Sequence, residues 1–163
     1  MNKKKNFSRI LSFLPLLLML SVIFSFSAQT GEQSGSLSFS VAQKIVEIKD
    51  RLFSRAESAE QILQEAEKIH FYVRKAGHMG EYFLLALTVY LPLSVYGQKG
   101  ISRFLWALGV SVLFAGLDEF HQSFVAGRGP SAADVGIDSC GALLALLLAE
   151  GIGFLHRRYR KKV

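Results

Sequence analysis

Four long apolar segments recur along the 163-residue chain, and charged residues are nearly absent inside them. They cover residues 10–26, 78–96, 101–117 and 134–155. The segments are too long for strands, and a backbone in lipid must satisfy its hydrogen bonds within its own segment. A stretch of about 18 or more apolar residues spans a hydrocarbon layer of roughly 30 Å. The pattern therefore predicts an all-α integral membrane protein, a bundle of four transmembrane helices.

The first apolar segment has features of both a membrane anchor and a cleaved secretory signal. It is preceded by basic residues, namely Lys3, Lys4, Lys5 and Arg9. The run is longer than the core of a usual signal, and Phe26-Ser27-Ala28 makes a poor cleavage site. We therefore expect a basic tail at residues 1–9 and a retained transmembrane helix at residues 10–27.

The segment at residues 28–77 differs from the spans because its apolar positions follow a helical period. Residues 29–37 are rich in Ser, Gly and Gln and predict a flexible linker. Ser40 and Gln43 then have the spacing of a capping box. The following pattern predicts one amphipathic helix, or two with a break near residues 54–58. Its apolar stripe would pack on the bundle or the outer leaflet, or would dock an extracellular partner.

The net charge of +6 and the pI of about 9.6 come from basic residues that flank the spans. Four spans would place both tails and the turn around Lys99 and Arg103 on one side, with 11 of the 19 basic residues. The other side would hold 8 basic and 12 acidic residues. The positive-inside rule then predicts a multi-pass protein of the cell membrane with both termini cytoplasmic. Since the basic residues are not interleaved with aromatic ones, no nucleic-acid partner is expected.

Ionisable residues enter the spans at one end of the predicted bundle. Charge in hydrocarbon costs on the order of 2.5 to 3.5 kcal/mol on insertion scales, so such residues are candidates for function. Alternating spans bring these residues to the same outer end, and carboxylates there need a basic partner. The predicted cluster consists of Lys75, His78, Glu81, Asp118, Glu119, Gln122, Arg128 and Asp134, with His121 and Asp138 beside it.

Part of this cluster has a purely structural interpretation. Ser131 would cap the last span with Asp134 three positions later, where the helix dipole favours an acid. Asp118 and Glu119 lack that explanation, because they lie at the carboxyl end of the third span and oppose its dipole. The sequence alone leaves Asp134 open as helix starter or ligand contact.

Three further features of the last span have structural interpretations. A stripe of small residues four apart would let another helix approach closely, namely Gly141, Ala145, Ala149 and Gly153. Glu150 would snorkel to the interface or pair with His156 or Arg157. The single cysteine, Cys140, excludes an internal disulfide and a cysteine metal cluster.

The order of these motifs resembles the VanZ-like family of small bacterial membrane proteins. The resemblance rests on Phe26-Ser-Ala-Gln29, Lys75-Ala-Gly-His78-Met-Gly-Glu81-Tyr82, Asp118-Glu119-Phe-His121-Gln122, Gly127-Arg128-Gly-Pro130-Ser131-Ala-Ala-Asp134-Val and Gly141-Ala142. It implies a VanZ-like core at residues 78–156, followed by a basic tail at residues 157–163. The family commonly carries asparagine where Asp138 stands. Its name-giving relative is associated with resistance to teicoplanin, a glycopeptide antibiotic that acts outside the cell on lipid-linked wall precursors.

Three functions are compatible with the cluster. In the first, it binds a polar or anionic group at the membrane surface, such as a lipid-linked cell-wall precursor. Arg128 and Lys75 would hold the anion, while carboxylates and Gln122 would take hydroxyls, amines or amides.

The second function is that of a membrane-embedded enzyme, with His78 or Glu81 as general base or with a metal site. The metal site would use His78, Glu81, Glu119 and His121. The third is that of a non-catalytic assembly partner in which the cluster only joins helices. We expect the lipid bilayer as a partner and no resident cofactor or metal.

Overall fold

The computed structural model describes residues 3–160, and this range contains six helices and no strand. The ends of the predicted basic tails, residues 1–2 and 161–163, lie outside the described residues. The helices are α1 (Lys3–Leu11), α2 (Leu14–Ser27), α3 (Gly31–Phe53), α4 (Ala59–Val95), α5 (Gly100–Gln122) and α6 (Ala132–Arg160). The predicted all-α fold is confirmed.

Within the described residues, three helices are long and apolar enough to cross a membrane. They are Phe7–Ser27, which joins α1 and α2, Gly100–Gln122 (α5) and Ala132–Arg160 (α6). They match the first, third and fourth predicted spans. The second predicted span lies in α4, which does not qualify. The reason is its composition, because α4 begins with a charged half, and His78 and Glu81 interrupt the apolar half.

The structure differs from the predicted linker at residues 29–37. Helix α3 already begins at Gly31, because Thr30 and Gln33 form a capping box ahead of it. The Ser40 side chain therefore lies inside the helix, where it donates to the backbone carbonyl of Ser36 at 2.9 Å. A serine or threonine with glutamine three positions later occurs twice in this region, as Thr30 with Gln33 and as Ser40 with Gln43, and local sequence alone does not decide which pair starts the helix.

The predicted break near residues 54–58 is present. Ser54 and Ala56 have positive φ angles of 49° and 52°, which end the α3 helix. A second capping box, formed by Ser58 and Gln61, starts α4. That helix then continues without interruption for 37 residues. The second part of the amphipathic segment and the second apolar segment therefore form one continuous helix.

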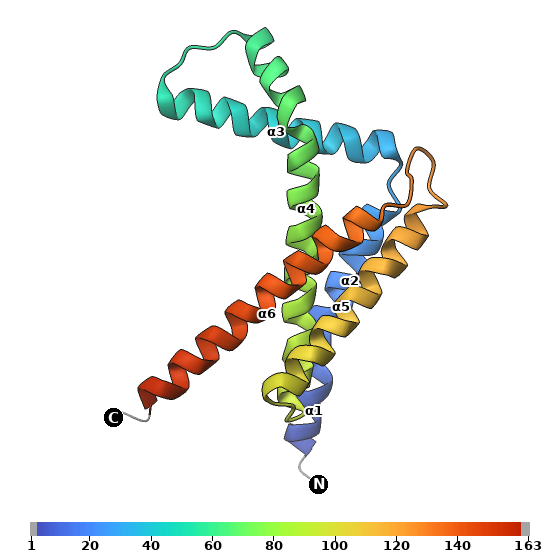
Figure 1. Cartoon of the computed structure of the whole chain (residues 1–163), viewed down its shortest axis with the longest axis vertical. Coiled ribbons are helices and arrows are strands. Elements are labelled where there is room, and N and C mark those ends of the chain that lie inside the picture. Colours follow the sequence, from blue (N-terminus) through green and yellow to red (C-terminus); the bar gives the residue numbers. More distant parts are fainter. Residues whose placement is uncertain (1–2, 161–163) are drawn as a thin grey trace.

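Helix α4 is the centre of the molecule. It contacts α2, α3, α5 and α6, with α3 lying across its amino-terminal half and α6 crossing it at an angle (Figure 1). The fully buried core residues of α4 are Tyr82, Leu85 and Ala86. Small residues face them from α5 and α6, and Ile23 adds a contact from α2. The core therefore occupies the apolar half of α4.

The crossing of α4 and α6 depends on the small-residue stripe of α6. A Cβ atom on Gly141 would lie 2.1 Å from the backbone carbonyl oxygen of Met79, so only glycine permits this approach. Ala142 and Ala145 are completely buried beside it. The predicted close helix contact is thus present, and its partner is α4.

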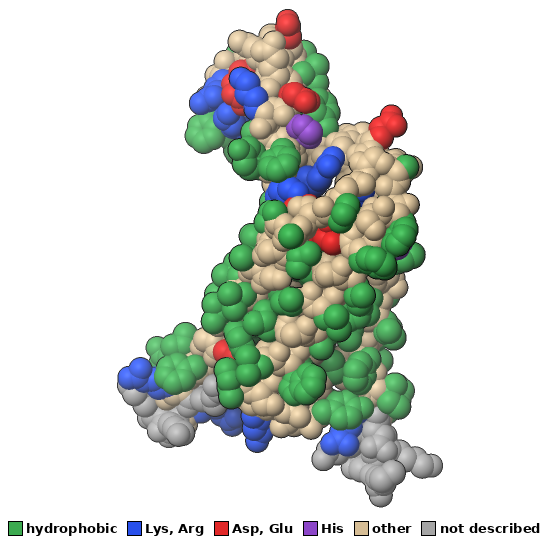
Figure 2. Space-filling model, turned by 45° about the vertical axis from the view of Figure 1, so that its right-hand side comes forward, with side chains coloured by type: hydrophobic (Ala, Val, Ile, Leu, Met, Phe, Trp, Pro, Cys, Tyr) green, Lys and Arg blue, Asp and Glu red, His purple; other side chains and the backbone are tan. Residues whose placement is uncertain are grey.

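Large apolar side chains cover the outside of the helical bundle. Leu17, Leu113 and Leu147 are all more than half exposed, on three different helices. Figure 2 shows the hydrophobic side chains over the body of the molecule and the charged side chains gathered toward its ends. An apolar exterior of this extent is typical of helices that face lipid. The protein is therefore a membrane protein, in contact with the bilayer.

Candidate functional site

The predicted site residues gather where α4, α5, α6 and the α5–α6 loop meet. This is the end of the bundle near α3, opposite the amino end of α1 and the carboxyl end of α6 (Figure 1). Helix α4 supplies Lys75, His78 and Glu81, and α5 supplies Asp118, Glu119 and Gln122; Arg128 comes from the loop and Asp134 from the first turn of α6. We use the name acidic cluster for His78, Glu81, Asp118, Glu119 and Asp138.

Lys75 and Asp134 form an ion pair that joins α4 to α6. The backbone N–H of Asp134 also donates to the side-chain oxygen of Ser131 at 3.3 Å, as expected for a capping serine. Asp134 therefore starts the helix and neutralises Lys75 at the same time. The ammonium group of Lys75 is therefore paired with this carboxylate and is not free to bind an anionic ligand.

Arg128 connects three parts of the chain. Its Nε donates to the carbonyl of Gln29 at 2.8 Å, and its Nη2 donates to the carbonyl of Phe26 at 2.9 Å. Its Nη1 donates to the side-chain oxygen of Gln122 at 2.7 Å. The last carbonyl groups of a helix have no partner within it. The guanidinium group of Arg128 binds carbonyls at the carboxyl end of α2 and links this end to α5.

A chain of hydrogen bonds runs from Arg128 into the acidic cluster. Gln122, held by Arg128, donates from Nε2 to one carboxylate oxygen of Asp118 at 2.8 Å. Glu119, which is only 4 % exposed, accepts the backbone N–H of Ser131 at 2.8 Å through Oε2. Both carboxylates therefore have one oxygen held in place, which fixes the orientation of each group.

Several buried polar atoms of the acidic cluster have no hydrogen-bond partner within the described part of the chain. They are both carboxylate oxygens of Asp138, Oε1 of Glu119 and Nδ1 of His78. Asp138 is completely buried. Unpaired buried groups of this kind cost free energy. The stability of the fold therefore does not explain why these unpaired polar atoms are buried.

His121 belongs to a different surface from His78. Its Nδ1 and the hydroxyl of Ser27 are 2.8 Å apart, and its ring lies 5.0 Å from that of Phe24. The four residues considered for a metal from the sequence are therefore not brought together. A group of ligand-type atoms is formed instead by His78, Asp118 and Asp138, from α4, α5 and α6.

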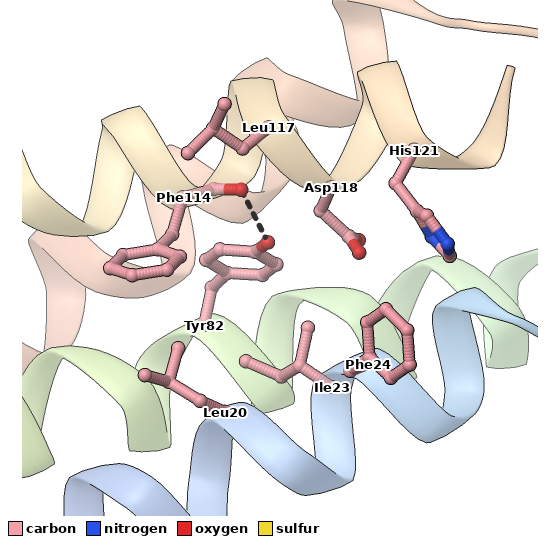
Figure 3. A pocket seen from close by; sticks show the side chains of 8 residues that line it. All are labelled: Leu20, Ile23, Phe24, Tyr82, Phe114, Leu117, Asp118 and His121. Atoms are coloured by element: carbon pink, nitrogen blue, oxygen red, sulfur yellow. Dashed lines mark hydrogen bonds between the residues drawn. The ribbon is translucent and has the colours of Figure 1, made fainter.

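An apolar cavity of about 330 Å³ opens beside Asp118, between α2, α4 and α5. Figure 3 shows Asp118 and His121 at one end and the rings of Tyr82 and Phe114 at the other. The hydroxyl of Tyr82 donates to the carbonyl of Phe114 at 3.2 Å, so it is already satisfied. The cavity is lined mainly by hydrocarbon, with its polar groups on one side.

A second cavity, of about 180 Å³, lies between α3 and α4 and is lined by four ionisable side chains, Arg74, His78, Glu81 and Arg128. Burial lowers the pKa of Arg128, and the positive charge of Arg74 lowers it further. Nε of Arg74 has no hydrogen-bond partner within the described residues. Two guanidinium groups thus share one small cavity.

Arg74 is the site residue that the sequence-based cluster omitted. It lies four positions before His78, on the same face of α4, so helical spacing was the signal that pointed to it.

Polar side chains also meet near the other end of the bundle. Oε1 of Glu150 accepts from Nη2 of Arg103 at 2.7 Å and from the hydroxyl of Tyr90 at 2.9 Å. Nη1 of Arg103 donates to Ser94 at 3.2 Å, and its guanidinium lies 4.2 Å from the Tyr90 ring centroid. We name these four residues the Arg103–Glu150 network. Glu150 thus pairs with Arg103 of α5, and the side chain of Arg157, one of its expected partners, lies outside the described residues.

Comparison with known proteins identifies the family. The family model described as VanZ/LLP1 matches residues 12–154, which is most of the chain. No curated protein and no solved structure matches it. The chain belongs to the VanZ-like family, as the order of its motifs indicated.

Proposed function

We propose that this VanZ-like membrane protein binds an anionic or polar group at the outer membrane surface through the cavity between α3 and α4. In this proposal the group belongs to a lipid-linked cell-wall precursor, and binding alters the response to teicoplanin. The observation that carries the proposal is the pair Arg74 and Arg128 in one cavity of about 180 Å³.

The electrostatics of the cavity support an anionic ligand. Like charges placed together repel, and an anion between them removes the repulsion and accepts charge-assisted hydrogen bonds. Arg128 is held in place by two backbone carbonyls and Gln122, so its position is set before a ligand arrives. Glu81 lines the same cavity and would accept hydrogen bonds from hydroxyl or amine groups of the ligand.

The apolar cavity beside Asp118 supports a ligand with a lipid part. Its lining includes Leu20, Ile23 and Leu117, which suit a hydrocarbon chain. Both cavities are lined by neighbouring positions of α4, since Glu81 faces one and Tyr82 the other. A lipid-linked molecule would place its polar group against Arg74 and its chain against α2.

The orientation in the membrane is part of the proposal. We infer that the apolar half of α4 crosses the bilayer with the other three spans, because core residues surround it, and that the cavities face outward with both termini cytoplasmic. The test uses single cysteines at Ser123, near the cavities, and at Gln98, in the α4–α5 turn, with Cys140 replaced by alanine. An impermeant maleimide should label position 123 in intact cells, and position 98 only after lysis. The opposite pattern overturns the orientation.

The binding proposal is tested by Arg74→Gln, with Lys68→Gln as the matched control. Lys68 is exposed on the same helix and does not line the cavity. We expect Arg74→Gln to reduce both the capture of a fluorescent lipid-linked wall precursor by protein in nanodiscs and the teicoplanin resistance of an expressing strain. The protein level should not change. Equal behaviour of the two variants, at equal protein level, contradicts the proposal.

A further inference from the structure

Three helices each direct one metal-ligand type of side chain to a common point inside the acidic cluster. His78 comes from α4, Asp118 from α5 and Asp138 from α6, and one ligand atom of each lies within 4.8 Å of the other two. Donor atoms bound to one ion at about 2.0 to 2.2 Å lie roughly 3.4 Å apart. Small side-chain rotations therefore suffice to bring the three onto one ion.

An independent observation indicates that something is bound there. Asp138 is completely buried, and neither of its oxygens has a hydrogen-bond partner among the described residues. An isolated buried carboxylate is strongly unfavourable unless a cation or donor accompanies it. Nδ1 of His78 is likewise buried without a partner. The nearest basic side chains are engaged elsewhere, since Lys75 pairs with Asp134 and Arg128 with backbone carbonyls and Gln122.

The charge of the group matches that of a divalent ion. Two aspartates and a neutral imidazole carry two negative charges, so a divalent cation would make the site neutral in a low-dielectric environment. A single positive charge would leave one carboxylate uncompensated. The mixture of one nitrogen and two oxygen donors suits a borderline ion such as Zn²⁺ better than Mg²⁺ or Ca²⁺, which prefer oxygen donors alone.

The surroundings hold one ligand in a defined orientation. Gln122 donates to one oxygen of Asp118, and Arg128 in turn donates to Gln122. Outer partners of this kind orient metal ligands and raise affinity.

We propose that His78, Asp118 and Asp138 form a binding site for one divalent transition-metal ion, with Zn²⁺ as the ion that fits the donors best. Three protein ligands leave a further coordination position. His78 also lines the cavity between α3 and α4, and Asp118 lines the apolar cavity, so this position is within reach of a ligand in either one. The metal site can be tested separately from the proposed anion binding, because Asp138 does not line the cavity that contains Arg74.

The test measures metal directly on the full chain. The protein is purified with a tag that contains no histidine, stripped with chelator and titrated with ZnCl₂ by calorimetry. Bound metal is counted by mass spectrometry, and Co²⁺ absorption reports the donor set. We expect one Zn²⁺ per chain. Asp138→Asn should weaken Zn²⁺ affinity by at least roughly 100-fold, because even outer-shell partners are worth about 10- to 100-fold.

Glu67→Gln is the control, since it removes an exposed acid from α4, the helix that carries His78, without touching the three ligands or the Lys75–Asp134 ion pair. It should bind Zn²⁺ as wild type does. If Asp138→Asn fails to fold, His78→Gln supplies the same test and should also lose the Co²⁺ spectrum. The proposal is overturned if wild-type protein holds no stoichiometric Zn²⁺, if the ligand variants bind it unchanged, or if Glu67→Gln loses it equally.

Discussion

The Arg103–Glu150 network and the acidic cluster differ in how their carboxylates are paired. Both place carboxylates among α4, α5 and α6. In the Arg103–Glu150 network, one oxygen of Glu150 accepts from Arg103 and Tyr90, and the Arg103 guanidinium also lies over the Tyr90 ring. In the acidic cluster, Asp138 is fully buried with both oxygens unpaired.

This difference separates a structural role from the binding role that we propose. A paired polar network in a membrane protein joins helices, and removing one member exposes the cost of the other. An unpaired buried carboxylate contributes nothing to folding by itself, so its presence points to a partner that arrives after folding. The Arg103–Glu150 network therefore serves as the example of a paired, structural group with which the unpaired acidic cluster is compared.

The largest effect is expected from Arg103→Ala. It removes the ion pair and the hydrogen bonds that Arg103 makes to Glu150 among packed helices, and we expect a loss of about 3 kcal/mol in unfolding free energy, measured by thermal or denaturant unfolding in detergent. The double variant Arg103→Met with Glu150→Met should recover most of this loss, because an apolar pair needs no compensation. Equal destabilisation of the single and double variants would contradict the assigned pairing.

The helix crossing between the two polar groups gives the next effect. Gly141→Ala places a Cβ atom 2.1 Å from the carbonyl oxygen of Met79, so α4 and α6 must separate. We expect a loss of about 2 kcal/mol, in the range typical of overpacking. Gly151→Ala on the same helix is the control, because no atom lies within 4 Å of its added Cβ. Gly151→Ala should leave stability unchanged or raise it, because alanine favours a helix over glycine. A similar loss in both variants would contradict the assignment of the loss to the close crossing.

Asp138→Asn should have the opposite sign to Arg103→Ala. In the presence of chelator, it removes an unpaired buried carboxyl, and we expect stability to stay level or to rise by up to about 1 kcal/mol. The measurement is the unfolding midpoint in chelator, compared with wild type. A loss of several kcal/mol would mean that Asp138 is a paired structural group like Glu150, and the contrast between the two ends would disappear.

The smallest effect concerns an exposed ion pair that joins α3 to α4, Lys49 and Glu65, with 2.6 Å between Nζ and Oε2. The hydrogen bond from Lys49 lowers the pKa of Glu65. Because the pKa is lower in the folded state, the stabilisation is present above the ordinary glutamate pKa and is lost as the pH falls through the folded-state value. The protection factors of α3 amides, which correct for the intrinsic pH dependence of hydrogen exchange, should therefore fall slightly at acidic pH in wild type and change less in Glu65→Gln.

Much of the fold follows from local patterns. The first, third and fourth spans were predictable because lipid requires both length and apolarity, and few other structures supply them. The break after α3 was predictable because the polar residues 54–58 interrupt the helical period of the apolar positions. The α3 start was not, because two serine- or threonine-to-glutamine pairs competed for it.

The sequence by itself determined that polar residues would meet at one end of the bundle, because helices that alternate in direction bring their polar ends together. The tertiary structure alone decided which of them pair. Lys75 meets Asp134 across 59 positions, Arg103 meets Glu150 across 47, and Asp138 meets no protein donor in the described chain. Hydropathy indicates where along a helix a polar residue lies relative to the apolar stretch. Which residue it pairs with depends on the rotation of each helix about its axis. That rotation is set by packing, as where Gly141 admits the backbone of Met79.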